Sequence, residues 1–466
     1  MFDFFLYFFA FLFLLGILVV AHEFGHFFVA RRCGIKVLRF SVGFGRTLWS
    51  RRFGRDQTEL ALCALPLGGY VRMLDERELE AGEHIDPKDL PRAFNRQNVR
   101  RRVAVVAAGP LLNLLLAFLL YWALFMMNNE ALRPVLGAPL LDSPAAEAGI
   151  QNGDTVLAVN GRAVATLENF HWRLLKDASE TGAENDALAL TLRDAEGRVS
   201  ERRLSVRRLA EANWEGDPFA LLGLRVFQLP ITPIIGVIES GSPADRAGLR
   251  AEDQILEVAA EGAANGTQIH YWPQFVDLIR RSANQPLAVT VRRADATFVF
   301  HVTPEDREGQ GRLGAGVAKA EVDKVGSSAL RVTVRYGVLE AAGRALSETW
   351  DKSVFSLVML WRMVTGDVSW KNLSGPLMIA DYAGKTASMG AAAYLKFMAL
   401  VSIGLGILNL LPIPILDGGH LLYYALEIVK GSPVSERFAA RGQRFGMAIL
   451  LFLMIFALFN DVNRLL

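Results

Sequence analysis

Residues 4–26 read FFLYFFAFLFLLGILVVAHEFGH, and this stretch decides the class of the fold. Its first 18 residues, between Asp3 and His22, carry no charge. As a helix with a rise of about 1.5 Å per residue they would span about 27 Å, close to the hydrocarbon core of a bilayer. A secretory signal peptide would begin with basic residues and end at a small-residue cleavage site. Here Asp3 precedes the run and His22-Glu23 follow it, so we predict a transmembrane helix.

The composition places the rest of the chain in the same class. The 466 residues are 52% hydrophobic and 21% charged, and their mean hydropathy is +0.26. Further uncharged runs cover 103–129, 397–416 and 445–460. We therefore predict a polytopic α-helical membrane protein with about four transmembrane helices. A net charge of +2, without a basic run that carries aromatics, excludes nucleic acid as a partner, and two cysteines exclude a disulfide framework.

The distribution of basic residues predicts the orientation in the membrane. Residues 31–102 hold 16 Lys and Arg against 9 Asp and Glu, several of them directly beside the predicted spans. Loops rich in Lys and Arg beside span ends stay in the cytoplasm. We expect the first and third loops to be cytoplasmic. Both termini and the long middle loop should then lie on the outer side.

The middle loop contains a tandem repeat. Residues 135–157 read VLGAPLLDSPAAEAGIQNGDTVL, and residues 234–256, at an offset of 99, read IIGVIESGSPADRAGLRAEDQIL. Each copy predicts a strand, a helix capped by the Ser of SPA, a Gly at the helix end and a new strand. This pattern resembles PDZ domains, which bind peptide C-termini as an added strand. Two β-rich spacers without a ligand are the alternative. Residues 326–366 predict an amphipathic helix, with a fifth span as the alternative.

The first span ends in the chemistry of a metal site. His22 and His26 are four residues apart in HEFGH, so a helix places both imidazoles on one face. This spacing suits two ligands of a tetrahedral Zn²⁺ ion, with Glu23 placed to act on a water molecule. A cluster of polar side chains that reaches the cytoplasmic headgroups is the alternative.

A zinc hydrolase uses a third protein ligand, and the sequence offers two candidates near the membrane. Asp417 ends an uncharged run in ILDGGHLL, where a dication is the natural reason to keep a carboxylate charged. His420 is the rival ligand. His84, His171, His270 and His301 lie in a charged loop or in the outer domains. We predict that one Zn²⁺ ion is held by His22, His26 and Asp417.

Four motifs together resemble the site-2 proteases, which are intramembrane zinc metalloproteases. They are HEFGH at 22–26, GGYVRM at 68–73, GPLLN at 109–113 and NLLPIPILDGGH at 409–420. The resemblance covers essentially the whole chain and extends to the tandem PDZ-like domains. It implies the same ligands as the residues themselves do, and it places the protein in the bacterial inner membrane with its active site toward the cytoplasm.

The predicted reaction is hydrolysis of a peptide bond inside a transmembrane helix, with Glu23 as the general base. A helical substrate must first unwind. Gly68, Gly69 and Tyr70 suit a β-turn, and the resemblance implies that they belong to a membrane re-entrant β-loop that pairs with the substrate. Pro412 and Pro414 should break the third span, and the resemblance implies that Asn409 contacts the substrate.

The resemblance also implies the substrates. They are single-pass proteins of the anti-sigma factor type, already cut outside the membrane, and remnant signal peptides. The PDZ-like domains could act as a size filter for them. Three other functions compete: a membrane scaffold with structural zinc, a metal transporter, and an anchored zinc protease for soluble peptides. The intact Glu23 and the position of Asp417 inside a span favour the intramembrane protease.

The predicted domains follow from these features. They are a first transmembrane helix at 1–31, a cytoplasmic loop at 32–102, a second transmembrane helix at 103–129, PDZ-like domains at 130–228 and 229–319, amphipathic helices at 320–390, a third transmembrane segment at 391–428, a cytoplasmic connector at 429–444, and a fourth transmembrane helix with its tail at 445–466.

Overall fold

The computed structural model divides the chain into two units. Unit 1 comprises Met1–Asn129, Ala210–Glu215 and Val334–Leu466, and unit 2 comprises Glu130–Leu209 and Gly216–Thr333. The residues that the structure describes are 2–78, 85–127, 129–140, 142–180, 186–227, 231–261, 266–307, 309–319 and 330–465. His84 and the predicted boundaries at 228/229 and 319/320 lie outside the described residues.

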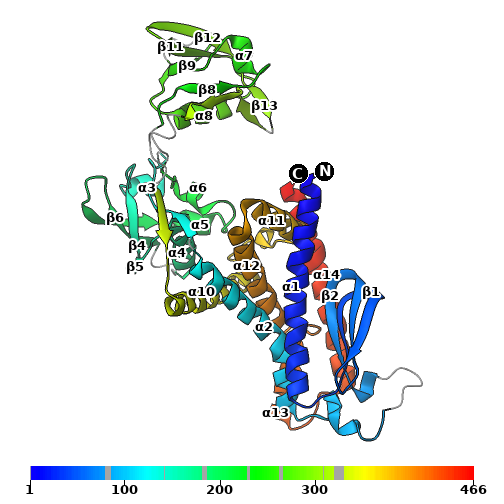
Figure 1. The fold of residues 1–466 in the computed structure, drawn as a ribbon. Coiled ribbons are helices and arrows are strands. Elements are labelled where there is room, and N and C mark those ends of the chain that lie inside the picture. The colour runs from blue at the N-terminus through cyan, green and yellow to red at the C-terminus, as the bar shows by residue number, and fades with distance from the viewer. Residues whose placement is uncertain are drawn as a thin grey trace. The chain divides into compact units, whose positions relative to one another are not determined.

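Unit 1 is built mainly from long helices (Figure 1). They are α1 (Phe2–Arg32), α2 (Val99–Met126), α10 (Val338–Thr365), α11 (Pro376–Met389), α12 (Ala391–Leu410), α13 (Asp417–Lys430) and α14 (Glu436–Leu465). Short 3₁₀ helices cover Glu76–Glu78, Leu90–Arg92, Phe94–Arg96 and Trp370–Asn372.

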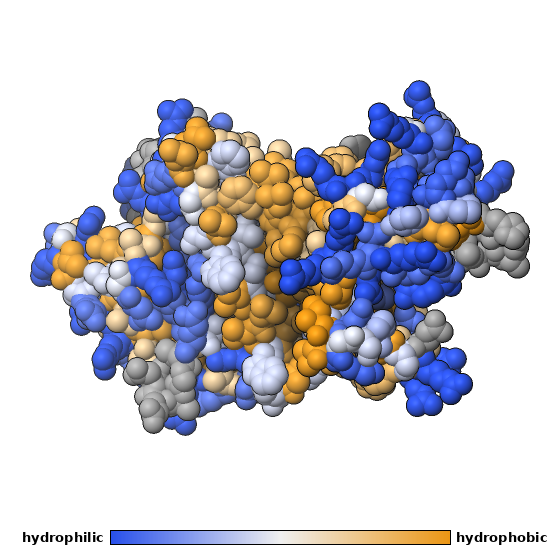
Figure 2. Space-filling model, turned by 90° about the horizontal axis from the view of Figure 1, so that it is seen from below, coloured by the Kyte–Doolittle hydropathy of each residue, from blue (hydrophilic) through white to orange (hydrophobic). Residues whose placement is uncertain are grey.

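Four of the described helices are long and apolar enough to cross a membrane. These candidate spans are Phe5–Arg32, Val99–Met126, Ala391–Leu410 and Arg437–Arg464, and each contains most of a predicted uncharged run. The amphipathic α10 is not among the four. Many large apolar side chains of the spans are exposed, including Phe9, Phe13, Leu111 and Phe452, and Figure 2 shows a broad exposed hydrophobic area. The chain thus fits a polytopic membrane protein.

Helix α2 is the centre of unit 1, because it packs against α1, α10, α12 and α13. Ala117 and Tyr121 of α2 form a buried cluster with Ile403 of α12 and Ala345 of α10. Asp461 of α14 joins this helix to α11. Its carboxylate accepts hydrogen bonds of 2.7–3.1 Å from three backbone amides at the start of α11, those of Gly375, Leu377 and Met378.

Beside α1 lies an antiparallel sheet made by only two long strands, β1 (Val37–Phe53) and β2 (Thr58–Met73) (Figure 1). Phe40 of β1 pairs with both Leu60 and Val71 of β2, so the first half of β1 lies between the two halves of β2. Gly43 has a φ of 89° where β1 bends, a conformation that favours glycine. The second half of β2 pairs, among the described residues, with β1 alone.

The prediction of a β-turn at Gly68–Tyr70 was wrong. These residues continue β2, with Gly69 paired to Val42 and Tyr70 paired to Ser41, while the chain reverses at residues 54–57. Gly68 has a φ of 151° and lies where the two halves of β2 meet. The glycines therefore allow a bend within one strand, which a turn signal cannot distinguish from a reversal.

The reversal at 54–57 is tied to the rest of unit 1 by an ion pair that should titrate. Both guanidinium Nη atoms of Arg92 donate to the carboxylate of Asp56, each at 2.7 Å. This hydrogen bonding lowers the pKa of Asp56. The stabilisation is therefore present above the unfolded pKa of about 3.9 and is lost as the pH falls through the lower folded value.

We expect Asp56→Asn to destabilise the protein by about 1 kcal/mol at about pH 6, and we expect this effect to shrink progressively as the pH falls below about 4. The measurement is the apparent unfolding temperature of both proteins in detergent across this pH range. Asp86→Asn is the control, because the Asp86–Lys88 pair is exposed to solvent and should contribute less to stability. A difference between Asp56→Asn and wild type that does not change with pH would contradict the assignment.

Unit 2 contains two sheets with the same strand order. One sheet runs β5-β4-β6-β7 and the other β10-β9-β11-β12. The elements of the first half are β3 (Asn129–Leu132), α3 (Pro144–Glu147), β4 (Thr155–Val159), β5 (Arg162–Ala163), α4 (Leu167–Glu180), β6 (Ala187–Arg193), β7 (Val199–Ser205), α5 (Arg207–Glu211) and α6 (Pro218–Leu222). Those of the second half are β8 (Ile235–Ile238), α7 (Pro243–Ala247), β9 (Gln254–Ala260), β10 (Thr267–Gln268), α8 (Trp272–Arg281), β11 (Leu287–Arg293), β12 (Ala296–Val302), β13 (Glu305–Arg307), β14 (Gln310–Arg312), β15 (Ala315–Val317) and β16 (Arg331–Val334).

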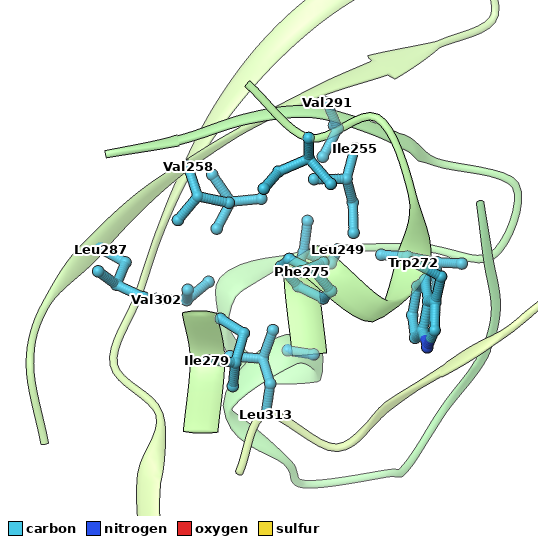
Figure 3. Close-up of a cluster of buried hydrophobic side chains, with 14 residues drawn as sticks. Leu249, Ile255, Val258, Trp272, Phe275, Ile279, Leu287, Val291, Val302 and Leu313 are labelled. Atoms are coloured by element: carbon cyan, nitrogen blue, oxygen red, sulfur yellow. The ribbon is translucent and has the colours of Figure 1, made fainter. Parts of the chain in front are cut away.

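The repeat signals correspond to local structure in both halves. Ser143 and Ser242 each cap a short helix by accepting a backbone N–H bond of 3.3 Å. In the second half, Phe275 and Ile279 of α8 pack against Val258 and Val289 in a closed apolar core (Figure 3). The halves differ at their first strand. The second copy forms β8, whereas the first forms only isolated bridges at Val135 and Leu136.

Candidate functional site

The two histidines of HEFGH lie on one face of α1, as the helical spacing predicts. Their ring centroids are 4.9 Å apart, and their Nε2 atoms are separated by 3.2 Å. His26 is buried and His22 is half-buried. The last three turns of an apolar helix therefore present two imidazole nitrogens to a common point.

Asp417 reaches this point from a different helix. Helix α12 ends at Leu410 and α13 begins at Asp417, so the predicted break at Pro412 and Pro414 is present. Between them and Asp417, Ile415 has a φ of 127°, which is strained for a β-branched residue. The carboxylate Oδ2 of Asp417 lies 3.1 Å from Nε2 of His22 and 3.5 Å from Nε2 of His26.

The three converging atoms fit a zinc ion. In a tetrahedral site with bonds of about 2.0–2.1 Å, two ligand atoms lie about 3.3 Å apart, and the three observed separations are 3.1, 3.2 and 3.5 Å. None of the described groups donates a hydrogen bond to Oδ2 of Asp417. Nδ1 of His26 donates to the carbonyl oxygen of Val105 at 2.9 Å, so the neutral ring carries its lone pair on Nε2. The donor set is therefore two imidazoles and one carboxylate, which suits Zn²⁺.

Helix α2 forms the wall behind both imidazoles. Val105, Gly109 and Asn113 follow one another at four-residue spacing, and the first and third bond to the two histidines. A Cβ atom on Gly109 would overlap Nε2 of His26 and lie 2.9 Å from Cε1 of His22. A Cβ atom on Gly25 of α1 would overlap the carbonyl oxygen of Ala108. The two glycines allow α1 and α2 to approach closely enough for the histidines to be held.

A partly buried ion pair holds α13 against the same wall. Arg102 of α2 donates to Oε1 of Glu427 on α13 at 2.5 Å, and its guanidinium lies 4.9 Å from the ring centroid of Tyr424. Arg102 is one turn before Val105, and Glu427 is on the helix that begins with Asp417. The pair therefore contributes to the distance between the carboxylate and the histidines.

Glu23 lies beside the ligands and against the sheet. Its carboxylate interacts electrostatically with His26, His22 and Asp417. A Cβ atom on Gly69 of β2 would lie 3.0 Å from Cγ of Glu23 and 3.0 Å from Cγ1 of Val19. The second half of β2 thus passes directly along α1 at the level of the candidate base.

The other predicted substrate-binding residues occupy different positions. Tyr70 stacks on Phe44, with centroids 6.2 Å apart, and the bend at Gly68 packs against the same ring. Pro414 packs against α14 at Gly442 and Gly446. Asn409 is half-buried near the end of α12, and Pro412 is exposed.

His420 is not part of the metal-ligand cluster that the described residues form, which contains His22, His26 and Asp417. His171, His270 and His301 belong to unit 2. Sequence reasoning missed the importance of Gly109, of the Val105 carbonyl and of the Arg102–Glu427 pair. GPLLN was the available signal for the first. The Val105 carbonyl is a backbone group, and Arg102 and Glu427 are 325 residues apart, so neither feature gives a signal in the sequence.

Comparisons with known proteins identify chains of the same organisation. The model of peptidase family M50 matches residues 10–453. A Neisseria meningitidis protein whose name describes a zinc metalloprotease is 40% identical over 462 residues, which cover 98% of this chain and 99% of the relative. The regulator of sigma-E protease RseP of Salmonella typhimurium is 39% identical over 460 residues, and that of Escherichia coli is 39% identical over 459 residues. Both alignments cover 98% of each chain.

Proposed function

Because the chain belongs to peptidase family M50, the zinc metalloendopeptidases of the site-2 protease type, we propose that it cleaves peptide bonds within transmembrane helices of single-pass membrane proteins. The observation that carries the proposal is the convergence of three side chains at one point. His22 and His26 lie on the candidate span Phe5–Arg32, and Asp417 begins α13 shortly after the candidate span Ala391–Leu410. A soluble-peptide protease would need no third ligand from within a membrane segment.

The assigned roles follow from the chemistry of the side chains. His22, His26 and Asp417 would hold the zinc ion through Nε2, Nε2 and Oδ2. Bound zinc supplies Lewis-acid chemistry, because it makes a water molecule more acidic and polarises a carbonyl group. Glu23 would accept the proton of the attacking water and deliver it to the nitrogen of the leaving amine. No serine or cysteine nucleophile takes part.

The sheet beside α1 supports a role in substrate binding. A transmembrane helix hides its carbonyl groups in internal hydrogen bonds and must be drawn out into an extended strand before it is cut. In the described residues, the second half of β2 pairs only with β1, and its Gly69 lies beside Glu23. We infer that Gly68, Gly69 and Tyr70 form a membrane re-entrant edge to which the unwound substrate adds as a strand.

The break between α12 and α13 is the second element assigned to the substrate. Asn409 would contact its backbone, and Pro412 and Pro414 would keep the segment before Asp417 out of the helical conformation. The strained Ile415 is consistent with a segment held in one conformation for function.

The two halves of unit 2 would act before the membrane step. Their shared strand order and capped SPA helices support a pair of PDZ-like domains. We infer that they bind peptide C-termini or admit only substrates that have already lost their outer domain. In this arrangement both domains and both chain ends are periplasmic, and the metal site is in the cytoplasmic half of the inner membrane. The exposed arginines beside α1 and α2, such as Arg32 and Arg100, support this orientation.

The names of the relatives suggest the pathway. Two of them are regulators of sigma-E, so we propose an anti-sigma factor as a principal substrate and remnant signal peptides as further ones. Neither binding to nucleic acid nor a soluble cofactor is part of the proposal.

The test is cleavage of a reporter in reconstituted membranes. The purified chain in lipid vesicles should cut a single-pass reporter inside its transmembrane helix. It should cut faster when the helix contains helix-destabilising residues, and it should lose activity on chelation and regain it with Zn²⁺. A matched reporter with a polyleucine helix is the control. If several destabilised helices remain intact, or if only the soluble flanks are cut, the proposal fails.

A further inference from the structure

We infer that Asn113 is a positioning residue for the metal site. Its side-chain oxygen would accept a hydrogen bond from Nδ1 of His22 and so keep the Nε2 lone pair of His22 directed at the metal. The inference rests on the proposed function, because it concerns the same metal site. It assigns a chemical role to a residue of the GPLLN motif for which the sequence left two interpretations open, close helix packing and a role in the site.

The position of Asn113 in the fold restricts what its side chain can do. The residue is fully buried in the middle of α2. Its backbone carbonyl accepts a hydrogen bond of 2.7 Å from Oγ of Ser402 on α12, which fixes the turn of α2 that carries it. The amide group lies 3.2 Å from Nδ1 of His22. A buried amide side chain at such a distance from an imidazole is costly unless the two form a hydrogen bond.

The direction of that hydrogen bond decides what His22 can bind. A neutral imidazole carries one proton, so an N–H at Nδ1 leaves the lone pair on Nε2, and the reverse also holds. Nε2 of His22 faces Oδ2 of Asp417 and Nε2 of His26. Only the tautomer with the proton on Nδ1 can supply a metal ligand at that point.

Only one end of the Asn113 amide can form a hydrogen bond with this tautomer of His22. If Nδ2 faced Nδ1 of His22, two N–H groups would oppose each other. If the oxygen faces it, the Nδ1 proton is accepted. The two orientations differ by a 180° turn of a nearly symmetric group, and hydrogen bonding decides between them. In the structure, Nδ2 of Asn113 faces His22, and Oδ1 of Asn113 has no hydrogen-bond partner within the described part of the chain. Metal ligation through Nε2 therefore favours the turned amide.

The second histidine is held in the same way. Nδ1 of His26 donates to the carbonyl of Val105, two helical turns before Asn113 on the same face of α2. A carbonyl can only accept, so His26 is restricted to the tautomer that presents Nε2. With Oδ1 of Asn113 as the acceptor for His22, one face of α2 would impose the same tautomer on both ligands. Such outer partners commonly change metal affinity by about 10–100-fold.

The test uses substitutions that separate acceptor from donor. Asn113→Leu removes the acceptor with little change in volume, and Asn113→Asp keeps an acceptor while it removes the donor. Ser402→Ala is the matched control, because it removes the hydrogen bond to the Asn113 backbone and leaves its side chain in place. Zinc affinity is measured by competition with a chromogenic chelator on the full chain in detergent. The visible spectrum of the Co²⁺ form reports the ligand geometry, and thermal unfolding of the chelated proteins reports folding.

We expect Asn113→Leu to bind zinc about 10–100-fold more weakly and to change the Co²⁺ spectrum. The zinc affinities of Asn113→Asp and Ser402→Ala should stay within about threefold of the wild-type affinity. Wild-type affinity in a folded Asn113→Leu variant overturns the inference, as does a folded Asn113→Asp variant that binds as weakly as Asn113→Leu. If Asn113→Asp does not fold, an unchanged Co²⁺ spectrum in Asn113→Leu overturns it. If wild type itself binds no zinc or cuts no helix, the proposed function fails instead.

Discussion

Replacing Glu23 with glutamine is expected to lower the rate of reporter cleavage by about 10²–10⁴-fold while bound zinc stays at the wild-type level. Glu23 is on α1 directly beside His22, but its side chain is not one of the three that converge on the metal position. The amide of glutamine has nearly the shape of the carboxylate and cannot accept a proton from water. The loss should therefore appear in turnover and not in metal binding.

The measurement combines single-turnover cleavage in vesicles with a zinc assay on the same preparation. Asp417→Asn is the contrasting variant, because it alters a predicted ligand and should lose zinc as well as activity. Glu340→Gln, on the exposed side of α10, controls for the chemical change itself. Cleavage by Glu23→Gln at a rate near wild type would remove Glu23 from the mechanism. Loss of zinc in the same variant would make it a ligand or a structural residue.

Gly109→Ala should have an effect of similar size through a different cause. A Cβ atom at this position would overlap Nε2 of His26 and lie 2.6 Å from its Cε1 atom. The ring has little room to retreat, because its Nδ1 atom is bonded to the Val105 carbonyl on the same helix. We expect zinc affinity to fall by about 100-fold and cleavage to fall in proportion to the zinc that is lost.

The matched control is Gly404→Ala in α12, where an added Cβ would meet no atom within 4 Å. That variant should keep full zinc binding and gain about 0.5–1 kcal/mol in stability, because alanine is the better residue in a helix interior. Excess zinc should partly restore cleavage by Gly109→Ala if the defect is in affinity. Normal zinc binding in Gly109→Ala would show that α2 does not lie against the histidines as described.

Much of the architecture could be predicted from short segments of sequence. The four spans followed from the lengths of uncharged runs, because a helix must satisfy its own backbone in lipid. The pairing of His22 with His26 followed from the helical period, and the caps at Ser143 and Ser242 from the local preference of serine. Each of these features depends on residues within one contiguous segment of the chain.

The sequence by itself thus determined which side chains can ligate a metal and which segments can cross a bilayer. Only the tertiary structure decided how Asp417 meets the histidines, that β1 and β2 fold into one bent sheet along α1, and that α2 is the wall of the site. Arg102 and Glu427 are 325 positions apart, and Gly109 matters only because two imidazoles pack on it. Such contacts depend on the close packing of helices that are distant in the chain. The residue pattern of one helix does not predict which other helix it packs against.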